Sequence, residues 1–268
     1  MLFTIIAVLS CGLSVLTYWL TGLFNYSPWF LFLLIPFTIT YGVILLNIYW
    51  ITIMLLASRY KNKENNEVNR FFLYNVRIIM SFLLTLQNIH IKKIKYRTPN
   101  EPSLVLFNHI TDYDPWALYR LTNGRYVFVG KKELKNIAII GSLSTAIGTL
   151  FVDRKDHNSS YEMCDLAVDY ITKKKTTVFI APEGTRSFTG QLNHFKHGGF
   201  NIALNSHCPI IMVGFKGMEK ASKKPLLKPC RVTVEMFKTL QYEDYKGMTA
   251  GELAEYCEKE YKKYLGQE

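Results

Sequence analysis

A histidine and an aspartate five positions apart are the residues of this chain best suited to do chemistry. His109 and Asp114 follow the apolar run Leu104–Phe107, with Asn108 between the run and the histidine. An imidazole titrates near neutral pH and can accept a proton, while a nearby carboxylate can fix the tautomer that leaves the far ring nitrogen free. The pair predicts a general base at a strand end, where open α/β sheets present functional groups.

Asp114 also has a purely structural explanation. Pro115 follows it, and Asp followed by Pro is typical of the N-cap and the first position of a helix, here one that contains Trp116 to Leu121. One carboxylate oxygen can bind helix amides while the other faces an imidazole. The two roles are compatible, and the sequence leaves both open.

A second set of polar residues follows the apolar run Thr176–Ile180. In the segment Pro182–Ser187, Gly184 permits a tight backbone. Side chains of the same segment offer donors to a phosphate group, namely Thr185, Arg186 and Ser187. The structural alternative is an ion pair between Glu183 and an arginine.

The elements that position these groups are predicted to form an α/β sheet. Five short apolar runs are expected as strands: 104–107, 126–129, 149–152, 176–180 and 209–215. Helical patterns alternate with them, beginning near Trp116, Lys132 and Tyr161. Two capping-box spacings mark helix starts, Ser159 with Glu162 and Thr249 with Glu252, the latter opening a helix expected on the surface. This alternation predicts an α/β fold with a mixed, largely parallel sheet flanked by helices.

The first 58 residues contain no Asp, Glu, Lys, Arg or His. Two apolar runs, Leu2–Leu20 and Trp29–Ala57, are long enough to cross a hydrocarbon layer of roughly 30 Å at about 1.5 Å per helical residue. They predict a two-helix membrane hairpin with a turn over Thr21–Pro28. The second run is followed by three basic residues, Arg59, Lys61 and Lys63. By the positive-inside tendency, they predict that the charged part of the chain lies in the cytoplasm.

Two other interpretations of the amino terminus compete with this hairpin. A cleaved signal peptide of lipoprotein type is suggested by the segment that precedes Cys11, but no basic n-region supports it. A hairpin that enters only one leaflet stays open, because Trp19, Trp29 and Trp50 would anchor either arrangement at the interface.

The chain is therefore predicted to have three parts: a membrane-anchoring hairpin over 1–58, a linker with an amphipathic helix over 59–98, and a catalytic domain over 99–268. The middle part begins with the polar stretch Lys61–Asn69. Val68–Ile91 is rich in Phe, Leu and Ile but punctuated by two arginines and a glutamine. This pattern predicts a helix against membrane or core and does not decide between them.

The composition limits the classes of binding partner that are expected for this chain. A formal charge of +11 and a sequence pI near 9.3, together with a membrane segment, predict an anionic lipid surface as the partner and not nucleic acid. No zinc-finger or helix-turn-helix signature accompanies the basic runs. The five cysteines show no paired spacing, which fits a reducing compartment. His194 and His197 have no further ligand nearby in the sequence, so no metal is expected.

Several linked segments together resemble the glycerolipid acyltransferase family, which includes 1-acylglycerol-3-phosphate acyltransferases. Three are similar to its first three blocks in order and spacing: Asn108-His109 with four residues before Asp114, Gly148–Arg154 and Phe179–Ser187. Lys131–Leu134 and Phe195–Phe200 are similar to segments that commonly accompany them. The likeness covers about Val105 to Phe215. It departs at the fourth block, where Met212 stands in place of a common second proline, a difference that bears on acceptor or acyl-chain preference.

The resemblance implies that His109 takes the proton of an acceptor hydroxyl, which attacks the thioester of acyl-CoA or acyl-carrier protein, while Asp114 orients the imidazole. It implies lysophosphatidic acid as acceptor and phosphatidic acid as product, with no cofactor. The residues implied to bind the acceptor around its phosphate are Lys131, Arg154, Glu183, Gly184, Thr185 and Arg186.

Three alternatives use the same features. The acceptor could be another lysophospholipid or glycerolipid, or water in a hydrolase, although no Gly-x-Ser-x-Gly elbow supports a serine hydrolase. A membrane-surface lipid-binding protein that no longer catalyses is the non-enzymatic alternative, and the intact His109 and Asp114 argue against it.

Overall fold

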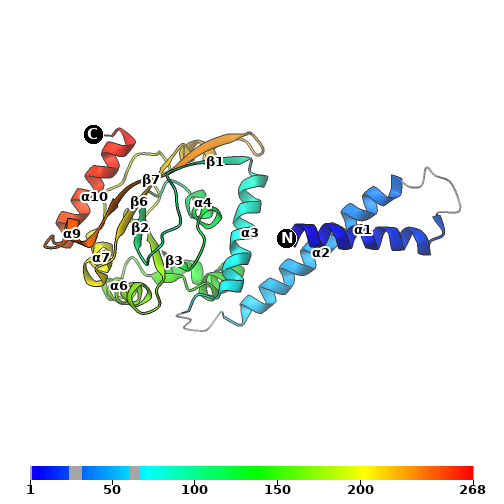
Figure 1. Cartoon of the computed structure of the whole chain (residues 1–268), viewed down its shortest axis with the longest axis horizontal. Coiled ribbons are helices and arrows are strands. Elements are labelled where there is room, and N and C mark those ends of the chain that lie inside the picture. The colour runs from blue at the N-terminus through cyan, green and yellow to red at the C-terminus, as the bar shows by residue number, and fades with distance from the viewer. Residues whose placement is uncertain (1, 24–31, 61–66, 268) are drawn as a thin grey trace. The chain divides into compact units, whose positions relative to one another are not determined.

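The computed structural model of the chain describes residues 2–23, 32–60 and 67–267. The chain divides into two compact units, Met1–Arg59 and Tyr60–Glu268, and each is described by itself (Figure 1). The predicted turn over Thr21–Pro28 and the linker Lys61–Asn69 fall partly outside the described residues, and Trp29 falls wholly outside them.

The first unit contains two helices, α1 (Leu2–Leu20) and α2 (Leu34–Ser58). By length and composition, both are apolar enough to cross a membrane. They pack through hydroxyl groups: Thr38 Oγ1 donates to Ser14 Oγ at 2.9 Å, and the hydroxyls of Thr17 and Tyr41 lie 2.7 Å apart. Interhelical hydrogen bonds of this kind are typical of helix pairs in lipid, because a bilayer offers polar side chains no water.

The second unit is built on a sheet whose described strands have the order β1-β7-β6-β2-β5-β3-β4. The strands are β1 (Ile89–Ile94), β2 (Leu104–Phe107), β3 (Tyr126–Lys131), β4 (Leu150–Val152), β5 (Thr177–Ile180), β6 (Ile210–Lys216) and β7 (Cys230–Leu240). Neighbouring strands are parallel except β6 and β7. The predicted mixed, largely parallel α/β sheet is confirmed.

Helices flank this sheet (Figure 1). They are α3 (Arg70–Leu86), α4 (Tyr113–Leu121), α5 (Ala138–Ala146), α6 (His157–Thr172), α7 (Asn201–Ser206), α8 (Met218–Lys223), α9 (Tyr242–Tyr245) and α10 (Ala250–Leu265), with 3-10 turns at Lys132–Asn136 and His197–Phe200. Every residue of β2 and β5 is buried, as expected of central parallel strands covered on both faces.

Two strands lie where the sequence analysis expected none. β1 follows α3 after only Gln87 and Asn88, and Asn88 turns the chain in a left-handed conformation at φ 54°. The helix predicted over Val68–Ile91 therefore included the first residues of β1, Ile89 to Ile91. β7 mixes apolar with charged residues. It lies near the edge of the sheet, where it pairs in parallel with β1 on one side and antiparallel with β6 on the other. Both α3 and β1 belong to the second unit.

The predicted helix starts have mixed outcomes. Thr249 and Glu252 form the expected capping box of α10. Ser159 does not cap α6: Asp156 does, and the Ser159 hydroxyl accepts from the backbone N–H of Asp153 at 2.9 Å. The prediction was wrong there because a better-placed acceptor lies three residues earlier. α10 is also more buried than expected, with Leu253, Cys257 and Tyr261 in the core.

Candidate active site

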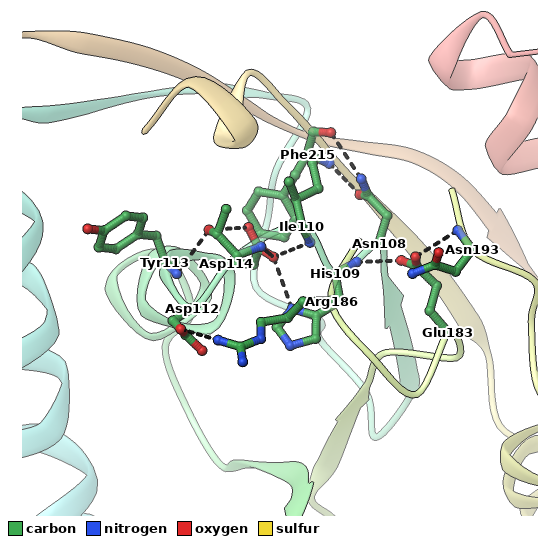
Figure 2. A network of polar contacts seen from close by, with 11 residues as sticks. Asn108, His109, Ile110, Asp112, Tyr113, Asp114, Glu183, Arg186, Asn193 and Phe215 are labelled. Carbon is green, nitrogen blue, oxygen red and sulfur yellow. Dashed lines mark hydrogen bonds and ion pairs between the residues drawn. The ribbon is translucent and has the colours of Figure 1, made fainter. Parts of the chain in front are cut away.

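The candidate site lies at the carboxyl ends of the neighbouring strands β6, β2 and β5. His109 follows the last residue of β2 by two positions, and Glu183 follows the last residue of β5 by three. Carboxyl ends of parallel strands meet at one edge of a sheet, so loops distant in sequence come together there. Figure 2 shows the resulting network of polar contacts.

His109 and Asp114 are in direct contact. His109 Nδ1 lies 3.0 Å from Asp114 Oδ2, the carboxyl group is fully buried, and the imidazole side chain is 17% exposed. An ionised carboxylate only accepts, so Nδ1 carries the proton and Nε2 keeps its lone pair. Within the described part of the chain Nε2 has no hydrogen-bond partner. It points away from Asp114 in Figure 2, and the ring is poised as a base.

Asp114 does not act as the N-cap of α4, contrary to one prediction. The helix begins at Tyr113, so Asp114 lies inside its first turn. Its Oδ2 reaches back to the loop before the helix and accepts from the backbone N–H of Ile110 at 2.6 Å and of Thr111 at 2.8 Å. Burial raises the pKa of the Asp114 carboxyl above its ordinary value, and the hydrogen bond from His109 opposes that rise.

Asn108 ties the end of β2 to β6. Its Nδ2 donates to the Phe215 carbonyl at 3.1 Å, and its Oδ1 accepts from the Phe215 N–H at 2.7 Å. The backbone pairing of β2 with β6 ends at Phe107 and Val213. The Asn108 side chain therefore continues the strand pairing beyond the backbone ladder and fixes the residue that precedes the base.

Glu183 holds the backbone of the base. Its Oε1 accepts from the His109 N–H at 2.6 Å and its Oε2 accepts from the Asn193 N–H at 2.9 Å. The side chain is buried, and burial raises the pKa of the Glu183 carboxyl to about 7 despite these two hydrogen bonds. Sequence reasoning placed Glu183 among the acceptor-binding residues and did not foresee its bond to His109, because 74 positions separate the two.

The loop after β5 is also bound to the loop after β2 through the backbone. Ser187 N–H donates to the His109 carbonyl at 2.9 Å, and Phe188 N–H donates to the Ile110 carbonyl at 3.0 Å. Gly184 has φ +68°, and the side chain of Lys196 packs so closely that a Cβ at Gly184 would lie 3.0 Å from Lys196 Cε. This is the tight backbone predicted for Gly184, and Lys196 is a cation that the sequence did not single out.

The predicted cations lie on the exposed side of the site. Arg186 forms an ion pair with Asp112, not with Glu183, and its guanidinium lies 4.7 Å from the ring centroid of Phe188. Burial lowers the pKa of Arg154, and the positive charge of Arg186 lowers it further, so the two guanidinium groups are within electrostatic reach.

The remaining predicted residues lie at the edge of this group. Lys131, at the end of β3, reaches Glu133 at 3.9 Å, and the charge of Glu133 also acts on Arg154. Thr185 is exposed beside Arg186. Arg154 and Arg186 with Lys131 are called the cationic cluster below.

The carboxyl-terminal helix α10 is hydrogen-bonded to the strands that carry the site. Tyr261 OH donates to the Leu106 carbonyl on β2 at 2.8 Å and to the Val213 carbonyl on β6 at 3.0 Å. Glu258 accepts from the Phe195 N–H at 2.9 Å and lies 2.7 Å from His194 Nδ1. His194 is thus a structural partner of Glu258. Among the described residues no group of three or more His, Cys, Asp or Glu could hold a metal ion.

Comparison with known proteins gives consistent matches. Residues 88–216 match the family model described as Acyltransferase. The human 1-acyl-sn-glycerol-3-phosphate acyltransferase alpha is 24% identical over 188 residues, which cover 70% of this chain and 59% of that protein. The Salmonella typhimurium 1-acyl-sn-glycerol-3-phosphate acyltransferase is 28% identical over 170 residues, 62% of this chain and 69% of the relative.

A solved structure shares the fold. The 1-acyl-sn-glycerophosphate acyltransferase PlsC from Thermotoga maritima aligns with a TM-score of 0.58 at 20% identity, covering 73% of this chain and 78% of that chain. The chain spans about 59% of the length of the mammalian relatives that it matches. Residues 88–216, which carry the candidate site, are similar to the Acyltransferase family, and the relatives that the chain matches are named as 1-acyl-sn-glycerol-3-phosphate acyltransferases.

Proposed function

We propose that this protein is a 1-acylglycerol-3-phosphate O-acyltransferase, which moves an acyl chain from acyl-CoA or acyl-carrier protein to lysophosphatidic acid and yields phosphatidic acid. The observation that carries the proposal is the imidazole of His109, with Nδ1 held by a buried carboxylate and Nε2 without a partner among the described residues. An alcohol is a poor nucleophile near neutral pH, so its acylation needs such a base. The relatives are named as 1-acyl-sn-glycerol-3-phosphate acyltransferases, which supports lysophosphatidic acid as the acceptor.

In the proposed reaction, His109 Nε2 takes the proton of the acceptor hydroxyl as its oxygen bonds to the thioester carbonyl carbon. The tetrahedral intermediate collapses, the C–S bond breaks, and the imidazolium returns the proton to the leaving thiolate. Asp114 stabilises the imidazolium and holds the ring in one tautomer. Transfer is direct, without an acyl-enzyme.

The acceptor's phosphate is proposed to bind at the cationic cluster. Arg186 would leave Asp112 for the phosphate, because a phosphate offers a guanidinium several charge-assisted hydrogen bonds at once. Arg154 and Lys131 add positive charge, and Thr185 adds a hydroxyl donor. Gly184 keeps the loop tight, and Glu183 contributes by holding the loops together through the backbone of His109 and Asn193.

The two-helix unit is proposed to anchor the enzyme in the membrane, with the second unit on the cytoplasmic side. The length and apolar composition of α1 and α2 support the anchor. Arg59, which follows α2, supports the orientation together with the basic residues after it. A membrane location brings the lipid acceptor to the enzyme, while a cytoplasmic face gives access to a soluble thioester.

The test is acyl transfer by the purified protein from a labelled thioester to lysophosphatidic acid, with the product identified by mass. We expect His109→Ala to lose about 10²- to 10⁴-fold in kcat/KM, the usual contribution of a general base, while circular dichroism stays unchanged. His90→Ala is the matched control, since His90 is exposed on β1. Full activity in His109→Ala would reject the base.

Two further assays extend the test: one omits the acceptor, and the other replaces it by a different lipid. Release of free fatty acid without a lysolipid would mean that water is the true acceptor. A panel of other lysophospholipids and glycerolipids, compared by kcat/KM, then identifies the preferred acceptor. If a lysolipid without a phosphate monoester is the better substrate, lysophosphatidic acid is rejected as the acceptor.

A further inference from the structure

The helix α3 is apolar on two faces. Its inner face is buried and includes Phe72, Leu73, Val76 and Leu84. Arg77 also points inward, where Nε donates to the Tyr119 carbonyl at 3.2 Å and Nη2 donates to Asn123 Oδ1 at 2.5 Å. Large apolar side chains point outward as well, each between 43% and 51% exposed: Phe71, Tyr74, Phe82 and Leu86. A surface helix that faces water would carry polar side chains on this outer face.

A second exposed apolar group adjoins the carboxyl end of this helix. Leu226 and Leu227, in the segment between α8 and β7, are 66% and 59% exposed. Asn88 Nδ2 donates to the Leu227 carbonyl at 2.7 Å, and Lys224 Nζ donates to the Gln87 carbonyl at 2.5 Å, which fixes the segment beside the end of α3. Figure 1 shows α3 in cyan along one side of the second unit. The outer face of α3 with Leu226 and Leu227 is called the docking surface.

The charges around the docking surface have one sign. Apart from the inward-pointing Arg77, residues 68–100 contain five Arg or Lys and no Asp or Glu, and residues 220–231 contain five Arg or Lys and no Asp or Glu. Basic residues beside a membrane are attracted to an anionic lipid surface. A second copy of this chain docked on the same face would bring these positive charges together. The charge pattern therefore favours a lipid surface over a dimer.

Chain connectivity keeps the docking surface near the anchor. α2 ends at Ser58 and α3 begins at Arg70, so residues 59–69 connect them. Eleven residues span at most about 40 Å when fully extended, at about 3.6 Å each. The first residue of α3 is therefore never far from the end of an apolar helix long enough to cross a membrane.

We infer that the second unit lies directly on an anionic lipid bilayer through the docking surface, with Phe71, Tyr74, Phe82, Leu86, Leu226 and Leu227 inserted at the boundary of headgroups and acyl chains. This contact is additional to the two-helix anchor and does not depend on acyl transfer. α3 is bound to the chain around α4 through Arg77, and the first turn of α4 carries Asp114. Docking would hold the proposed base one helix away from the lipid.

The experiment places a fluorescent label on the full-length protein in vesicles that contain anionic lipid. Cys11 is the exposed cysteine and is first changed to Ser, since the other four are buried. Tyr74→Cys and Phe82→Cys then label the docking surface. Tyr161→Cys is the matched control, because Tyr161 is an aromatic side chain on α6 with 68% exposure. Each label is quenched with spin-labelled lipid and, separately, with aqueous iodide.

We expect the labels at 74 and 82 to be quenched by the lipid-borne quencher and shielded at least five-fold from iodide relative to the label at 161. Iodide quenching equal to that at 161 would overturn the inference, because the face would be in water. Shielding from iodide without lipid quenching would also overturn it, because protein would then cover the face, either the hairpin or a second copy.

A charge reversal gives an independent readout of the lipid partner. Lys223→Glu with Lys228→Glu should reduce lipid quenching of the label at 82, whereas Lys259→Glu, at an exposed position of α10, should not. Replacing the anionic lipid by neutral lipid should have the same effect as the double reversal. Lipid quenching that is unchanged both by the charge reversal and by neutral lipid would contradict the proposed recognition of an anionic surface. The readout holds even if the protein acylates a different acceptor or none.

Discussion

The proposed general base, His109, and the cationic cluster differ in how firmly the structure holds them. His109 is fixed at three points: its Nδ1 by Asp114, its N–H by Glu183 and its carbonyl by Ser187. Both carboxylates are buried. Arg186, in contrast, is held by one ion pair with the exposed side chain of Asp112.

This difference follows from what each group is proposed to do. A base must meet one hydroxyl proton along one direction, so positioning errors of about an ångström are costly. A phosphate is bound by charge and by several equivalent oxygens, so a mobile guanidinium can adapt to it. The comparison predicts large effects on turnover from the buried network and smaller effects on substrate binding from the exposed cluster.

The largest effect is expected at Asp114. Asp114→Asn removes the negative charge that stabilises the imidazolium and offers an amide that can donate to Nδ1, which selects the wrong tautomer. We expect a loss of about 10³-fold in kcat with a KM within about three-fold of the native value, measured by steady-state kinetics. Asp112→Asn, at the exposed residue directly before α4, is the control. A loss of less than ten-fold in Asp114→Asn would mean that the carboxylate does not orient the base.

Glu183→Gln should give the next largest effect. The variant exchanges one charge-assisted bond to the backbone of His109 or Asn193 for a repulsive contact between donors. At about 1.5–3 kcal/mol for such a bond, we expect kcat to fall about 10- to 100-fold with little change in KM. If KM for lysophosphatidic acid rises instead, Glu183 contributes to acceptor binding and not to positioning of the base.

The pH dependence of stability gives Glu183 a second test. Its pKa is raised from 4.5 to about 7, so the protonated form is favoured in the folded state and its stabilising contribution is lost as pH rises from 4.5 through 7. The free energy of unfolding should therefore fall between pH 5 and pH 8 more in the native protein than in Glu183→Gln, by a few kcal/mol at about 1.4 kcal/mol per pKa unit, as measured by denaturant titration at each pH. Equal falls in both proteins would argue against a raised pKa.

Arg186→Ala should affect binding and spare turnover. We expect KM for lysophosphatidic acid to rise about ten-fold, since one charge-assisted contact with phosphate is lost, with kcat within three-fold. An acceptor without a phosphate monoester serves as the control and should show the same KM in both proteins. A fall in kcat alone would assign Arg186 to the reacting centre. The cationic cluster would then no longer differ in role from the buried network around His109.

The smallest effect is expected at the ion pair itself. Asp112→Asn removes an exposed pair, so the free energy of unfolding should change by less than about 1 kcal/mol. The freed Arg186 should lower KM for lysophosphatidic acid by about two- to three-fold at low salt, and the effect should fade at high salt. A raised KM would show that Asp112 holds Arg186 in its binding position.

The strands that carry the site were predictable because their residues are apolar over short runs. β2 was predicted over its full length, and β3, β4, β5 and β6 within two residues of each end. β1 and β7 carry several charged residues near the edge of the sheet, so their patterns were not separated from a helix or a loop. The apolar outer face of α3 was also not predicted, since the pattern of Val68–Ile91 did not decide whether this helix lies against membrane or core.

The sequence alone indicated the proposed base and its orienting carboxylate, because His109 and Asp114 lie five residues apart and one turn of chain brings them together. The tertiary structure decided how the base is held. Glu183 lies 74 positions from His109, and Phe215 lies 107 positions from Asn108. Contacts across such separations depend on the order of the strands, and strand order is set by packing of the whole sheet and leaves no local pattern in the chain.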